Sequence, residues 1–179
     1  TFAFAIISLS FTILCDKKNW ILEVFTILVF TSNTSSKKEG LINAWNAILL
    51  DFPKERLDFL KEISASKKYR LFLLSNTNDL HIKWIQNSLG EVFFQEFKNS
   101  FEQFYLSHEI NLRKPDSEIY EFVLNENNLI ADETLFVDDL KENTDSARKL
   151  GIHVWNLIPK QEDVIELLTK IKMNWFIYF

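Results

Sequence analysis

The sequence predicts an α/β fold, a doubly wound (Rossmann-like) parallel sheet. Short, continuously apolar runs alternate with longer segments whose apolar residues recur at helical spacing. This alternation is typical of a parallel sheet with crossover helices. The apolar runs at 71–74 and 134–137 are each followed by polar residues. Because ligands of such sheets bind where the strands end, these polar residues are the first functional indication.

Residues 1–38 form an atypical apolar N-terminal segment followed by a polar linker. Residues 1–15 carry no charge, but this run is shorter than the ~20 residues of a membrane span. It also lacks the basic region of a signal peptide. Three interpretations stay open for residues 1–30: one or two buried strands, a membrane-associated hairpin, or foreign sequence from a truncated or frame-shifted gene. The charged break at 16–18 makes a membrane interaction the least favoured.

The middle of the chain alternates between expected helices and strands. Residues 39–52, where Leu41, Trp45 and Leu49 recur at helical spacing, are expected to be helical. Residues 53–170 are expected to form the core domain, and 171–179 an apolar tail. Within the core we expect a helix opened by Pro53, strands within 71–74, 101–110, 134–139 and 152–157, and helices at 79–89, 116–127 (capped by Asp116 or Ser117), 143–150 (closed by Gly151) and 161–171.

The composition narrows the possible functions. Hydrophobic residues make up 47% of the chain and charged residues 25%, as in an ordinary globular domain. The net charge of -5 and the pI near 5.3 argue against a nucleic-acid partner. The single cysteine, Cys15, cannot form an intrachain disulfide, which fits a cytoplasmic protein. No Cys or His group has zinc spacing.

The candidate site consists of three polar clusters: Ser75 with Asn76, Lys114, and Asp138 with Asp139. A hydroxyl, a backbone amide donor and a fixed cation suit the oxygens of a phosphoryl group, so Ser75, Asn76 (through its main-chain N–H) and Lys114 are the expected substrate-binding residues. Two carboxylates suit Mg²⁺, which prefers oxygen ligands and keeps several waters. Asp138 is the expected direct ligand and Asp139 a supporting or water-bridged one. Singly, each residue is more often a turn former, a solvated cation or a helix cap.

Other residues near the clusters have weaker assignments. Asn143 is expected to hold the lysine or a metal-bound water. Arg113 is left open between supporting the phosphate loop and lying on the surface. His81 and His108 are expected to be structural, since the sequence suggests no partner for either.

The order of the three clusters resembles the haloacid dehalogenase (HAD) superfamily. LFLLSN, LRKPDSEIY and TLFVDD are similar to its second, third and fourth motifs, and AWNAILLDFPKERLDFLKEI resembles the end of a small helical cap and the helix returning to the core. The resemblance covers roughly residues 39–160. It implies that the doubly wound sheet carries a remnant of a helical cap, at residues 39–52. It implies an Mg²⁺-dependent phosphatase of a small phosphorylated metabolite, with Ser75 and Lys114 as catalytic residues. A haloacid dehalogenase is the alternative within the same subfamily.

The family's first motif, an apolar strand that ends in Asp-x-Asp or Asp-x-Gly, has no match. AIISLSFTIL places Ser8 and Ser10 at its two positions, and Asp16 is followed by two lysines. In the family the first aspartate forms an aspartyl-phosphate and the second protonates the leaving group. We therefore expect a chain with little activity. It is either a hydrolase whose true N-terminus is lost, with 1–35 foreign, or a silent phosphate-binding or interaction domain. Residues 4–14 are expected to fill the position of the first strand.

Overall fold

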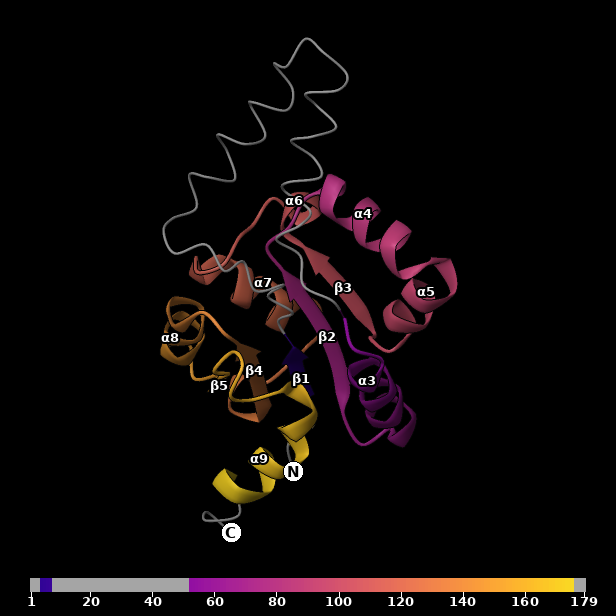
Figure 1. The fold of residues 1–179 in the computed structure, drawn as a ribbon. Coiled ribbons are helices and arrows are strands. Elements are labelled where there is room, and N and C mark those ends of the chain that lie inside the picture. The colour runs from indigo at the N-terminus through magenta and orange to yellow at the C-terminus, as the bar shows by residue number, and fades with distance from the viewer. Residues whose placement is uncertain (1–3, 8–51, 176–179) are drawn as a thin grey trace. The chain divides into compact units, whose positions relative to one another are not determined.

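A parallel sheet forms the centre of the computed structural model, with its described strands in the order β3-β2-β1-β4-β5 (Figure 1). The structure describes residues 4–7 and 52–175. The predicted doubly wound α/β fold is confirmed. The strands are β1 Phe4–Ile7, β2 Arg70–Ser75, β3 Gln103–Leu106, β4 Thr134–Asp138 and β5 His153–Asn156.

Strand β1 lies in the middle of this sheet, between β2 and β4. Ile7 pairs with Leu73 of β2 on one side and with Val137 of β4 on the other. The prediction that residues 4–14 fill the first-strand position is confirmed for residues 4–7, and residues 8–14 lie outside the described part of the chain. The strand order reverses direction at β1, so the ends of β1, β2 and β4 meet at the switch point where such sheets bind ligands.

Helices flank the sheet in two layers. Helices α7 and α8 lie on one side and α3, α4 and α5 on the other (Figure 1). Their bounds are α3 Lys54–Ser66, α4 Asp79–Leu89, α5 Glu91–Asn99, α6 Ser107–Ile110, α7 Ser117–Glu126, α8 Lys141–Lys149 and α9 Leu167–Trp175, with 3-10 turns η1 Ala131–Glu133 and η2 Val164–Glu166.

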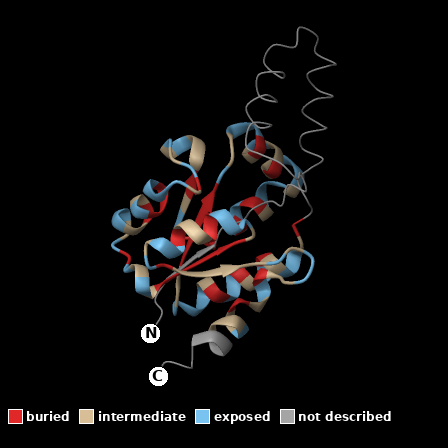
Figure 2. Cartoon of the chain, turned by 90° about the vertical axis from the view of Figure 1, so that its left-hand side faces the viewer, coloured by how far each residue is buried: buried red, intermediate tan, exposed pale blue. Residues whose placement is uncertain are grey.

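The core forms where the two layers meet the strands. Residues 71–75 of β2 and all of β4 are buried, as continuous apolar runs predict for strands covered on both faces. Phe72 and Leu74 pack with Tyr120 and Val123 of α7 on one face. Since successive strand residues point to opposite faces, Leu71 and Leu73 face the other layer. Figure 2 shows the buried residues gathered along the strands and the inner helix faces.

Three expected elements have different bounds in the structure. The strand expected within 101–110 stops at Leu106, because the hydroxyl of Ser107 binds both the N–H and the carbonyl of Thr77 and directs the chain into α6. The last helix begins at Leu167 rather than at 161 and continues to Trp175. A separate turn, η2, precedes it because Asp163 caps residues 164–166 through a capping box. Helix α8 begins at Lys141, two residues before the expected start.

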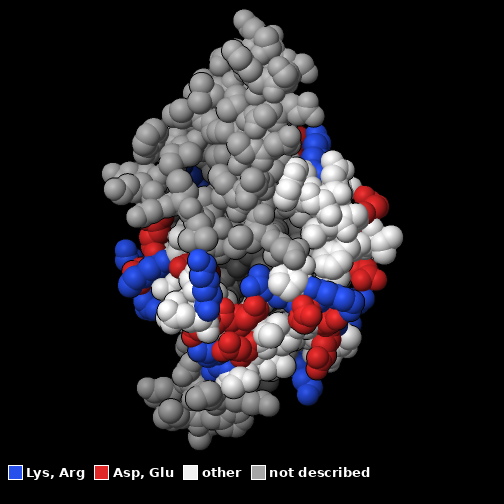
Figure 3. Space-filling model, in the orientation of Figure 1, with Lys and Arg blue, Asp and Glu red and all other residues white. Residues whose placement is uncertain are grey.

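The chain divides into two units by its internal contacts, Thr1–Ser10 with Phe52–Phe179 and Phe11–Asp51. All described residues belong to the first unit. The expected cap remnant at 39–52 lies outside them, except for Phe52, and the bounds of the four expected segments stay predictions. No described helix has the length and apolar character needed to span a membrane. On the face in Figure 3, described side chains of both charges are interspersed.

Candidate functional site

A buried ion pair at the ends of the central strands joins two of the predicted clusters. Lys114 Nζ lies 2.9 Å from Asp138 Oδ2, and the two side chains are 2% and 0% exposed. Lys114 Nζ also donates to the main-chain carbonyl of Leu74, at 3.1 Å. The lysine therefore bridges the ends of β2 and β4, which lie on either side of β1.

The carboxylate of Asp138 is held by two further groups on its own segment. The Asn143 amide donates from Nδ2 to both carboxylate oxygens, each at 3.1 Å. The main-chain N–H of Leu140 donates to Oδ1 at 2.7 Å. Asn143, expected to hold the lysine or a metal-bound water, thus binds the lysine's partner instead. With charge-assisted bonds on both oxygens, the position of this buried carboxylate is fixed.

The side chain of Asn76 makes contacts that the sequence analysis did not foresee. Its side chain pairs with the backbone of Lys114, since Oδ1 accepts from Lys114 N–H at 2.9 Å and Nδ2 donates to Lys114 O at 2.8 Å. This double hydrogen bond joins the loop after β2 to the loop before α7. The Asn76 side chain is thereby a positioning group for Lys114, and its main-chain N–H stays a predicted phosphate donor.

The loop after β2 is fixed from its other side by α6. Ser107 Oγ accepts from Thr77 N–H at 3.0 Å and donates to Thr77 O at 3.1 Å. Nδ1 of His108 lies 3.2 Å from the same carbonyl. Ser75, 6% exposed at the end of β2, begins this loop. His108 is therefore a structural residue, as predicted, and it helps to hold the loop that carries Ser75.

Asn156, at the end of β5, is a residue that the sequence analysis missed. Its Nδ2 donates to the main-chain carbonyls of Asp138 at 3.1 Å and of Asp139 at 3.0 Å. Leu157 N–H donates to the same Asp138 carbonyl. An asparagine at a strand end gives no sequence signal that separates this bond from an ordinary turn. The structure shows that β5 supports the backbone of both aspartates.

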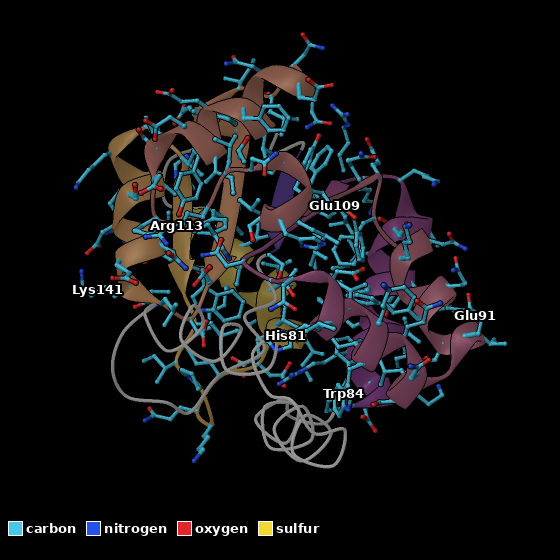
Figure 4. The ribbon with its side chains drawn as sticks, turned by 90° about the horizontal axis from the view of Figure 1, so that it is seen from above. His81, Trp84, Glu91, Glu109, Arg113 and Lys141 are labelled. Carbon is cyan, nitrogen blue, oxygen red and sulfur yellow. The ribbon has the colours of Figure 1, made fainter. Side chains whose placement is uncertain are left out.

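Two other predicted residues lie apart from the ion pair. The Arg113 side chain is 54% exposed and its guanidinium lies 3.7 Å from Asp116, and the question whether Arg113 also supports the phosphate loop stays open. His81 is 6% exposed on α4, where it is part of the core, as expected of a structural histidine. Figure 4 views the sheet from above, with Arg113 and Lys141 on the side of α7 and α8, and His81 near the centre.

The residues present fit Mg²⁺ by the chemistry of their donors. Asp138 and Asp139 leave the end of β4 together, and one or two carboxylates suffice for a cation that takes its other ligands from water and phosphate. No group of three or more His, Cys, Asp or Glu side chains that could hold a metal occurs within the described ranges. Asp138 accepts hydrogen bonds from Lys114, Leu140 and Asn143, and its assignment as the direct ligand, with Asp139 in support, stays a prediction.

The sequence that follows β1 supplies no acidic residue until Asp16. Ile7 pairs with Val137, and the next residues along the two segments are Ser8 and Asp138. Ser8, Ser10 and Asp16 lie outside the described residues. The predicted absence of a carboxylate at this sequence position therefore rests on the sequence itself.

Comparisons with known proteins show the family of the chain. Residues 21–157 match the family described as haloacid dehalogenase-like hydrolase. A D-ribitol-5-phosphate phosphatase from Bacteroides thetaiotaomicron is 29% identical over 112 residues, which cover 63% of this chain and 53% of the relative. The chain thus spans about half the length of this curated relative.

Solved structures share the fold. A HAD family enzyme from Bacteroides thetaiotaomicron, in complex with magnesium and inorganic phosphate, is 26% identical with a TM-score of 0.70, over 93% of this chain and 99% of that one. A HAD-like hydrolase from Porphyromonas gingivalis is 19% identical with a TM-score of 0.69, over 96% of this chain and 98% of that one. The second likeness concerns the fold alone.

Proposed function

Because the chain belongs to the haloacid dehalogenase-like hydrolase family, we propose that its described residues form the phosphate- and metal-binding part of an Mg²⁺-dependent phosphatase site. The proposed substrate is a small phosphorylated metabolite. The observation that carries this proposal is the buried Lys114–Asp138 pair at the strand ends, beside Ser75 and Asp139. The phosphatase named above and the relative with bound magnesium and phosphate support it.

Each residue contributes a defined interaction. The Ser75 hydroxyl and the main-chain N–H of Asn76 donate hydrogen bonds to the phosphoryl oxygens. Lys114 supplies positive charge close by, and its low exposure strengthens that interaction because little water screens it. The Asn76 side chain keeps Lys114 in place through its backbone.

Asp139 and Asp138 would hold Mg²⁺ at the end of β4. When bound, the cation neutralises phosphoryl charge and polarises a phosphoryl oxygen. Asn156 fixes the main chain of both aspartates, and Asn143 fixes the Asp138 side chain. These contacts fix the backbone from which both carboxylates project.

The covalent step of a phosphatase of this family needs a carboxylate nucleophile, and Ser8 and Ser10 stand in the sequence where Asp-x-Asp is expected. A serine there has no acidic neighbour to act as its base in the printed sequence. We therefore expect the chain to bind phosphate but to turn over little or no phosphate ester. This serine pair favours a second candidate function, a silent phosphate-binding domain.

Restoring the carboxylates tests the proposal directly. We expect Ser8→Asp/Ser10→Asp to gain Mg²⁺-dependent hydrolysis of p-nitrophenyl phosphate. The matched control, Ser8→Asn/Ser10→Asn, keeps the size without the charge and is expected to stay inactive. Adding Asp138→Asn to the aspartate variant should abolish the gain.

Two results would count against the proposal. Hydrolysis by the unmodified chain that Asp138→Asn abolishes would show that another nucleophile is present. If the aspartate variant folds and binds phosphate but stays inactive, the silent phosphate-binding domain becomes the better description.

A further inference from the structure

The Tyr120 hydroxyl is hydrogen-bonded to Asn143, a residue that holds the Asp138 carboxylate of the proposed site. Tyr120 is fully buried in the first turn of α7, and its hydroxyl donates to the main-chain carbonyl of Asn143, at 2.9 Å. The side chain of Asn143 in turn donates to both oxygens of Asp138. The two sets of hydrogen bonds meet at Asn143: Tyr120 of α7 binds its main chain, and its side chain binds the carboxylate at the end of β4.

The ring of Tyr120 reaches the other member of the ion pair. It packs edge-on against Phe136, with centroids 5.3 Å apart and planes at 78°. Lys114 Nζ lies 5.7 Å from the centroid of the same Phe136 ring. Tyr120 thus supports Asp138 through hydrogen bonds and Lys114 through aromatic packing.

The ring of Tyr120 fills space in the core, whereas its hydroxyl serves only to make a hydrogen bond. A phenylalanine ring would fill the same space in the core, but it could not bind the Asn143 carbonyl. Burial, together with the nearby Asp138 carboxylate, raises the pKa of Tyr120 far above its usual value, so the hydroxyl stays a donor at any ordinary pH. Low exposure also strengthens each of these hydrogen bonds, because little water competes for the donor and the acceptor.

We propose that Tyr120 is a positioning residue for phosphate and Mg²⁺ binding, acting through Asn143 on Asp138. This inference rests on the proposed function, because it concerns how the Tyr120–Asn143 hydrogen bond affects the affinity of the proposed phosphate and Mg²⁺ site. Tyr120 touches neither ligand. Its contribution is to fix the position of the Asn143 side-chain amide at the start of α8. That amide holds the Asp138 carboxylate in the position where it pairs with Lys114.

The test compares two buried tyrosines that differ in location. Tyr105 is 3% exposed, and its hydroxyl accepts from Asn127 Nδ2 at 2.7 Å, at the opposite end of α7 from Tyr120. Tyr120→Phe and Tyr105→Phe each remove one buried, hydrogen-bonded hydroxyl. Calorimetric titration with inorganic phosphate in the presence of Mg²⁺ should give a roughly three- to tenfold weaker affinity for Tyr120→Phe, the effect of one buried hydrogen bond. Tyr105→Phe should leave the affinity within about twofold of the unmodified chain, since a bond of similar strength is lost elsewhere.

A second readout keeps the inference separate from the proposed function. The side-chain amide signals of Asn143, observed by NMR, should shift in Tyr120→Phe and not in Tyr105→Phe. Unchanged Asn143 signals in Tyr120→Phe would overturn the inference. So would a phosphate affinity of Tyr120→Phe equal to that of the unmodified chain, provided that the unmodified chain binds phosphate. If the unmodified chain binds no phosphate, the proposed function fails, and the Asn143 signals alone decide whether Tyr120 positions this segment.

Discussion

Removing the cation of the buried pair should destabilise the protein far more than removing an exposed one. Lys114→Met keeps most of the side chain's apolar volume but leaves the Asp138 carboxylate, 0% exposed, without its cation. Breaking a buried pair in this way typically costs about 3–5 kcal/mol, because one charge stays desolvated. The bonds from Asn143 and Leu140 persist and place the expected loss near the lower end, about 3 kcal/mol.

The double variant Lys114→Met/Asp138→Leu separates this penalty from the net contribution of the pair. With both charges gone, no buried ion is left unpaired, so its stability should lie closer to that of the unmodified chain. The exposed control is Lys141→Met, which removes a pair whose side chains are 74% and 38% exposed and should leave stability nearly unchanged.

The assay is equilibrium unfolding in urea, followed by far-UV circular dichroism for all three variants. Equal losses in Lys114→Met and Lys141→Met would refute the reasoning. So would a double variant that is less stable than Lys114→Met, because the desolvated charge would then not be the source of the loss.

Three further predictions concern other contacts. Burial lowers the pKa of His81 to about 4, below its ordinary 6.5, so the unfolded chain takes up the proton first and stability is lost as the pH falls from 6.5 toward 4. In urea unfolding at each pH, His81→Gln should lose about 2 kcal/mol less stability than the unmodified chain between pH 6.5 and 4.5. Equal losses of stability in the two chains would contradict this. Asn76→Ala should weaken phosphate binding in calorimetry by freeing the Lys114 backbone. The control Asn78→Ala, which removes only the cap of α4, should lower stability by about 1 kcal/mol and leave phosphate affinity unchanged. Equal phosphate affinities of Asn76→Ala and Asn78→Ala would argue against a positioning function for Asn76. Arg56 donates through two nitrogens to Asp163, so Arg56→Lys should lower thermal stability by about 1 kcal/mol, and an unchanged melting temperature would show that this pair contributes nothing.

The sequence predicted those elements that have local signals. Helix α4 has the bounds expected, because Asn78 caps its start and Gly90 follows its end. Strands β2 and β4 were identifiable because both are buried on two faces. The three clusters could be predicted to meet because parallel strands end at one edge of a sheet.

The remaining features depend on contacts between residues far apart in the sequence. The end of β3 depends on Ser107 binding Thr77, and the supporting position of Asn156 depends on β5 lying beside β4. The hydroxyl of Tyr120 also gave no signal, since a core aromatic residue is equally expected there. In each case the deciding partner lies at least 17 residues away along the chain, beyond the reach of helical and strand periodicity.

The most direct test of the proposed site is calorimetric titration of the unmodified chain with inorganic phosphate, with and without Mg²⁺, beside Ser75→Ala. The proposed site predicts binding that is strengthened by Mg²⁺ and weakened roughly tenfold or more when the buried hydroxyl is removed, as for a hydrogen bond to a charged group. Phosphate binding that is absent, or that is the same in Ser75→Ala and independent of Mg²⁺, would contradict a phosphate- and metal-binding site at these strand ends.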